Sequence, residues 1–236
     1  IPAERLPDGM ELRTLADTVQ STRLFNESEP GFRAVLDDIA RRGVRYVVVV
    51  GDYSDDGQDE SVAASLALMQ SYADRFGMQF FSTVGNHDVY AYSGRSLDRS
   101  FLLAEGGTFL VSGSKPDGDG VLFNPAMRCR SYAESLPRGL GFFRSGAELH
   151  WESPFGPSDD LADRQYTLAS ADGRHIRRFV DASYLVEPVE GVWLLSIDGN
   201  VFVPRDGEFA LAEEEFDDST DAGYNALVAH RPDRKS

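Results

Sequence analysis

The first ninety residues alternate between short apolar runs and amphipathic stretches. Apolar residues within 31–42 and 61–77 recur at intervals of three and four, which is typical of a helix with one buried face. Residues 44–50 form a β-branched run with too little alternation for a strand wetted on one side, so a buried parallel strand is expected. Residues 78–84 predict the next strand, and residues 10–16 are a weaker strand candidate. The predicted order is β-α-β-α-β, which implies parallel strands joined by right-handed crossovers.

The pattern loosens over residues 89–188, where Gly-rich and aromatic segments replace helical periodicity. Residues 166–169 and 174–180 flank Asp172-Gly173, a dipeptide suited to a hairpin turn. We therefore expect an insertion of loops and short antiparallel strands that overhangs the strand ends. Residues 192–197 return to the pattern of a core strand. The whole chain, 1–236, is predicted to be a single α/β domain with a core at 8–88, an inserted cap at 89–188 and a return to the core sheet at 189–236.

Composition agrees with one sizeable globular domain, since 42% of the residues are hydrophobic and 26% are charged. No apolar run approaches the roughly 18 residues that a spanning helix needs, so no membrane insertion is expected. The formal net charge is −16, which repels nucleic-acid backbones and anionic lipid. A small phosphorylated substrate can bind only where local cations reverse this field.

The single cysteine, Cys129, excludes an internal disulfide framework and a CxxC zinc site, and we expect its thiol to be inert.

Polar residues follow each of the three predicted strands. Asp17, Gly51-Asp52 and Gly85-Asn86-His87-Asp88 all fall at carboxyl ends, where parallel sheets bind ligands. Oxygen and nitrogen ligands of this kind suit divalent ions such as Mn²⁺, Fe, Zn²⁺ or Mg²⁺. Two such ions about 3.5 to 4 Å apart can clamp a phosphoryl group and generate a hydroxide near neutral pH.

These residues also carry a family resemblance. Residues 51–57 (GDYSDDG) and 85–88 (GNHD), each closing a hydrophobic strand, resemble the GD and GNHD blocks of the calcineurin-like metallophosphoesterase superfamily. The resemblance implies a layered α/β sandwich and hydrolysis of a phosphate mono- or diester at a centre of two divalent metal ions. It makes Asp17, Asp52 and Asn86 metal ligands, with Asp52 bridging both ions. His87 would act as general acid or charge stabiliser near the leaving oxygen, and Asp88 would orient its imidazole.

Two departures from the family pattern bear on activity. The family places histidine two residues after its first aspartate, whereas Val19 stands there in this chain. The later GHxH block is absent, and the four histidines are at 87, 150, 175 and 230. Because the chain ends abruptly after His230, we expect a C-terminal portion to be missing, and His230 itself is a candidate later ligand. The alternative is a non-catalytic scaffold that serves binding or interaction.

Other polar residues have ordinary structural interpretations. Acidic residues at 55, 56, 59 and 60 lack an EF-hand pattern and are expected at the N-terminus of the helix near Ser61. His150 and His175 are expected at the surface or in packing. Two interpretations remain open for Tyr90, Tyr92 and Arg95, which either line the substrate mouth or are plain loop residues. Asp198 and Asn200 resemble a strand end near the family's site that does not ligate metal.

Overall fold

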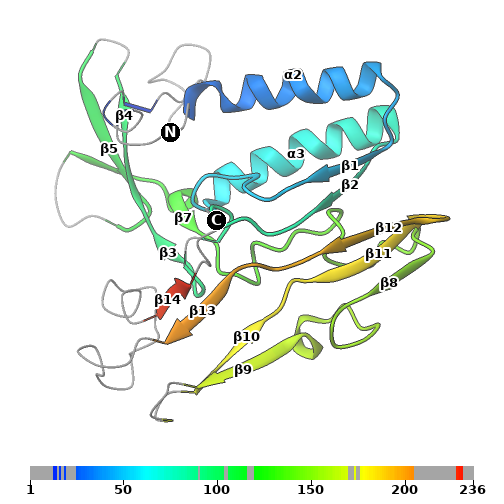
Figure 1. The fold of residues 1–236 in the computed structure, drawn as a ribbon. Helices are drawn as coiled ribbons and strands as arrows, with labels where there is room; N and C mark the ends of the chain where they lie inside the picture. The colour runs from blue at the N-terminus through cyan, green and yellow to red at the C-terminus, as the bar shows by residue number, and fades with distance from the viewer. Residues whose placement is uncertain are drawn as a thin grey trace.

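The computed structural model is mixed α/β, and its first elements follow the predicted order (Figure 1). Helix α2 (Ser28–Arg41) leads to strand β1 (Tyr46–Val49), and helix α3 (Asp59–Phe76) leads to strand β2 (Gln79–Ser82). β1 and β2 are parallel neighbours, with Tyr46 opposite Gln79 and Val49 opposite Ser82. The two helices pack side by side along this pair (Figure 1). The structure describes residues 13–14, 16, 19, 25–89, 91–103, 106–115, 120–169, 173, 176–204 and 227–230.

Local sequence explains where α3 begins and ends. Asp59 and Glu60 form an acidic first turn, as predicted, and favour the positive end of the helix dipole. Gly77 closes the helix in the left-handed conformation, with its N–H donating to the Ala73 carbonyl at 2.8 Å. The helix buries Val62, Leu68, Met69 and Tyr72 along one face.

Most of the strand predicted at residues 10–16 lies outside the described residues. Within it, Arg13 forms an isolated antiparallel bridge with Phe101, and Ala16 is helical. The prediction of a strand that continues to Ala16 is therefore wrong at its end. The bridge instead connects the start of the chain to the region predicted as an insertion.

No α-helix occurs among the described residues of 91–188, in agreement with the loose sequence pattern. The predicted hairpin is confirmed: β9 (Gln165–Ala169) and β10 (Ile176–Val180) pair antiparallel around Gly173. The other strands of this region form three small sheets. They are β3 (Arg95–Ser96) with β7 (Arg128–Cys129); β4 (Asp98–Leu102), β5 (Thr108–Ser112) and β6 (Val121–Phe123); and β8 (His150–Glu152) with β11 (Tyr184–Val189) and β12 (Val192–Ser196). The described residues also include three short 3₁₀ helices, which are η3 (Phe25–Glu27), η4 (Pro125–Met127) and η5 (Leu161–Asp163).

The last described strands lie near residue 200. A strand does form at 192–197, but β12 pairs antiparallel with β11 and leaves Trp193 and Leu195 more than half exposed. It is therefore an edge strand rather than a core strand. β13 (Val201–Pro204) pairs antiparallel with β14 (Leu227–His230).

One large apolar core joins the N-terminal elements to the middle of the chain. Tyr132, Phe142, Trp151 and Tyr184 pack in the same cluster as residues of α2, α3, β1 and β2. The Tyr184 hydroxyl donates to the Ser82 carbonyl at 2.8 Å across 102 residues of sequence. The predicted division of the chain at residues 88 and 188 remains a prediction. Within the described part of the chain, no helix is both long and apolar enough to span a bilayer.

Candidate active site

The loops after β1 and β2 pack directly against each other, backbone to backbone. A Cβ atom on Gly57 would lie 2.3 Å from the Asp88 carbonyl oxygen, and one on Gly85 would lie 2.1 Å from the Asp52 nitrogen. Gly57 also has φ +60, in the left-handed region that disfavours L side chains. Asp52 and Asp56 adopt positive φ as well, at 50° and 57°. The close approach therefore requires glycine at two positions and fixes how the two loops face each other.

Asp52 reaches from the first loop to the second. Its Oδ1 accepts a hydrogen bond from the backbone N–H of His87 at 2.9 Å, and the side chain is exposed. The carboxylate at the end of β1 therefore lies against the loop that carries Asn86 and His87. An ionised carboxylate has about four acceptor sites, so this single bond leaves capacity for a cation.

Asp88 ties the two loops together. Its side chain is fully buried; Oδ1 accepts from the backbone N–H and the hydroxyl of Ser54, both at 3.0 Å, and Oδ2 accepts from the Gly85 N–H at 2.8 Å. Burial raises the pKa of Asp88 to about 7, against the opposing effect of these hydrogen bonds. Its predicted orientation of the His87 imidazole remains a prediction.

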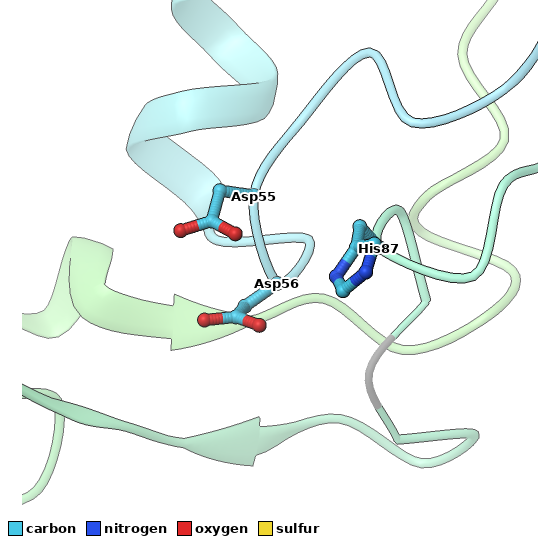
Figure 2. Close-up of side chains that lie close together, drawn as sticks. All are labelled: Asp55, Asp56 and His87. Carbon is cyan, nitrogen blue, oxygen red and sulfur yellow. The ribbon is translucent and has the colours of Figure 1, made fainter. Parts of the chain in front are cut away.

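Asp55, Asp56 and His87 form a cluster that was not expected. One ligand atom from each lies within 4.8 Å of the other two. Figure 2 shows the two aspartates on the first loop and His87 on the loop that faces it. Asp56 is buried, whereas Asp55 and His87 are half-buried. Both aspartates were expected at the start of a helix, but α3 begins only at Asp59. Their position inside the GD block, shortly after Asp52, is the signal that could have linked them to the site.

Two arginines face the aspartates of this cluster. Arg13 Nη1 lies 3.5 Å from Asp55 Oδ2, and Arg99 pairs through Nη2 with Asp56 Oδ2. Burial disfavours the charge of Arg99, yet the neighbouring Asp56 outweighs it and raises the pKa of the guanidinium. The carboxylates of the site thus have arginine partners, in a protein whose net charge is −16.

The donor set fits a divalent metal ion. Carboxylate oxygens and an imidazole nitrogen are the ligands that Mn²⁺, Fe or Zn²⁺ accept, and Asp52 adds another carboxylate at the same pair of loops. Other predicted ligands are not placed at the site by the structure. Asp17 lies outside the described residues, and His230 ends β14 opposite Val201 without a described side chain. Val19 is 76% exposed and offers no ligand atom.

Two residues near the GNHD loop have packing or anchoring roles. Tyr92 stacks on Tyr132 with ring centroids 5.4 Å apart, and its hydroxyl accepts from the Val180 N–H, so it belongs to the core. Asn200 Nδ2 donates to the Val84 carbonyl at 3.1 Å, directly before Gly85. Asn200 thus lies beside the start of the GNHD loop, whereas the Asp198 carboxylate accepts from the Tyr132 hydroxyl and the Ala182 N–H.

The remaining candidates have structural interpretations or lie outside the described residues. His150 contacts Glu152 at 3.4 Å and lies beside Trp193, as expected for a surface residue. Burial raises the pKa of Cys129 to about 12, which agrees with an inert thiol. Arg95 is half-buried in β3, and Tyr90 and His175 are outside the described residues.

Comparison with known proteins identifies the family. The family model of the calcineurin-like phosphoesterases matches residues 25–174, which is more than half of the chain and includes both loops of the site. The chain therefore belongs to the calcineurin-like phosphoesterase family. No curated protein and no solved structure matched it.

Proposed function

We propose that this chain hydrolyses a phosphate mono- or diester at the loops that follow β1 and β2. Membership of the calcineurin-like phosphoesterase family implies a hydrolase acting on phosphoester bonds. The observation that carries the proposal is the 2.9 Å hydrogen bond from the His87 N–H to Asp52 Oδ1, which brings a strand-end carboxylate to the Asn86-His87 loop.

In this proposal, Asp52 and Asn86 hold divalent metal together with Asp17. When bound, the metal supplies positive charge to the phosphoryl oxygens and lowers the pKa of a coordinated water. Two ions need more donors than Asp52 and Asn86 provide, and Asp55 and Asp56 offer further carboxylates on the same loop as Asp52. The number of ions and their identity are therefore part of the proposal and of its test.

His87 is the proposed proton donor to the leaving oxygen. A general acid must lie within hydrogen-bond reach of that oxygen and carry a proton at the working pH. One ring nitrogen of His87 lies within 4.8 Å of carboxylate oxygens of Asp55 and Asp56, so the imidazole is placed beside the loop that carries Asp52.

The test is hydrolysis of p-nitrophenyl phosphate and bis(p-nitrophenyl) phosphate with and without Mn²⁺. We expect Mn²⁺-dependent turnover that falls at least about 100-fold in Asp52→Asn and His87→Ala, the order of effect of losing an acid catalyst. Asp74→Asn, on the exposed face of α3, and His150→Ala are matched controls that should keep wild-type turnover. Unchanged turnover in both site variants would refute the assignment.

A non-catalytic binding role is the second candidate, and one observation favours it. Asp55 and Asp56 each already face an arginine, so their charge is compensated without a metal. Metal analysis after dialysis against Mn²⁺ separates the two functions. Retention of two equivalents, lost in Asp52→Asn, supports the hydrolase; no retained metal supports the binding role.

A further inference from the structure

We propose that Arg13 and Arg99 are the residues that bind the phosphoryl oxygens of the substrate, an inference that rests on the proposed phosphoesterase function. A protein with a net charge of −16 repels a phosphate ester until local cations reverse the field. Among the ion pairs of the described residues, these two arginines are the ones that reach the aspartates beside His87. They add cationic groups to the positive charge that a bound metal would supply.

Both arginines are positioned by β4. Arg99 and Phe101 are two residues apart in this strand, so their side chains leave the same face. Arg13 forms a backbone bridge to Phe101, and its guanidinium carbon lies 6.0 Å from the centre of the Phe101 ring. The Asn26 side chain accepts from the Arg13 N–H at 2.8 Å and fixes the backbone there. Both arginines thus reach the cluster from positions at β4.

Their surroundings suit retention of a bound anion. The side chains of Arg13 and Arg99 are only 13% and 21% exposed, so water screens their charge less than at an open surface. A guanidinium has five N–H donors in a planar fork. In Arg99, Nη1 donates to the Asp98 carbonyl and Nη2 donates to Asp56 Oδ2. Asp56 therefore orients the Arg99 fork, and among the described residues further N–H groups of Arg99 remain for an anion.

The placement relative to His87 gives the arginines a defined role. Asp56 links the two groups, because it pairs with Arg99 and one of its carboxylate oxygens lies within 4.8 Å of a ring nitrogen of His87. A substrate whose leaving oxygen faces His87 would therefore lie near the aspartates that the two guanidinium groups contact. Arginine forks match such oxygens in bidentate geometry.

Substrate charge provides the discriminating readout. A phosphate monoester carries close to two negative charges at pH 8 and a diester carries one, since the second ionisation has a pKa near 6. Arg99→Met and Arg13→Met should raise KM for p-nitrophenyl phosphate at least tenfold and raise KM for the bis-ester less, with kcat changed no more than threefold. Arg99→Lys keeps a charge beside Asp56 but loses the fork, and should raise KM about threefold. Arg42→Met, which removes an equal charge at the exposed end of α2, is the matched control.

Binding of inorganic phosphate gives a second measurement that does not depend on turnover. Equilibrium dialysis of the full chain, with and without Mn²⁺, should show weaker phosphate binding in Arg99→Lys and Arg13→Met than in Arg42→Met. KM and phosphate affinity within twofold of wild type in both variants would overturn the role of the arginines and leave the hydrolase intact. If the wild type hydrolyses neither ester, the proposed function fails, and phosphate dialysis alone then tests the arginine site. Weaker phosphate binding in the two arginine variants than in the wild type supports that site. Absence of phosphate binding by the wild type overturns it. Arg99→Lys and Arg13→Met keep the test decisive even if Arg99→Met does not fold.

Discussion

The contact between the two site loops predicts an unusually costly glycine substitution. Gly57 has φ +60, and a Cβ there would lie 2.3 Å from the Asp88 carbonyl oxygen. Gly43 has nearly the same conformation, with φ +67, but a Cβ at that position would have nothing within 4 Å of it. Substituting alanine at each position therefore separates backbone strain from the effect of loop contact.

The expected magnitudes follow from these two terms. The left-handed conformation costs an L residue about 1 to 2 kcal/mol, partly offset by about 0.4 to 1 kcal/mol from the stiffer unfolded chain. Gly43→Ala should thus lower the free energy of unfolding by about 1 kcal/mol. At Gly57 the new methyl also has to move away by about 1 Å to reach ordinary contact at 3.4 Å. Overpacking of this kind adds about 1 to 3 kcal/mol, so Gly57→Ala should cost about 2 to 4 kcal/mol in total.

Urea denaturation followed by circular dichroism measures both values. We expect the midpoint of Gly57→Ala to fall well below that of Gly43→Ala, with similar slopes for both variants. Because the Asp88 carbonyl adjoins His87 in sequence, Gly57→Ala should also lose ester hydrolysis while Gly43→Ala keeps it. Equal destabilisation by the two substitutions would refute the packing of the loops described above.

Two further predictions concern buried groups. Tyr184→Phe removes the donor to the Ser82 carbonyl and should lower the free energy of unfolding by about 1 to 2 kcal/mol; Tyr166→Phe, whose hydroxyl makes no hydrogen bond with a described residue, should cost less, and equal costs would contradict the role of this bond. Cys129 is fully buried and its thiol pKa is raised to about 12, so Ellman's reagent at pH 8 should label it in urea but not in the native protein. Rapid stoichiometric labelling without denaturant would contradict its burial.

Local sequence patterns determined the first half of the architecture. The three-and-four periodicity of apolar residues marks α2 and α3, and the β-branched run marks β1, because each pattern reflects the geometry of the element's own backbone. Parallel pairing of β1 with β2 follows from the crossover between them, so the meeting of the GD and GNHD loops at one sheet edge could be predicted. The edge position of β12 could not, because the same apolar residues occur in exposed and buried strands.

Tertiary structure alone decided the detailed composition of the site. Arg99 comes from β4 and Arg13 from the start of the chain, and neither has a local pattern that links it to Asp55 or Asp56. Likewise, Tyr184 and Ser82 meet across 102 residues. Such contacts depend on how whole sheets and loops pack, and a side chain's neighbours along the sequence carry no record of that packing. The sequence therefore determined which strand ends would meet, whereas the folded chain determined which charges would face each other there.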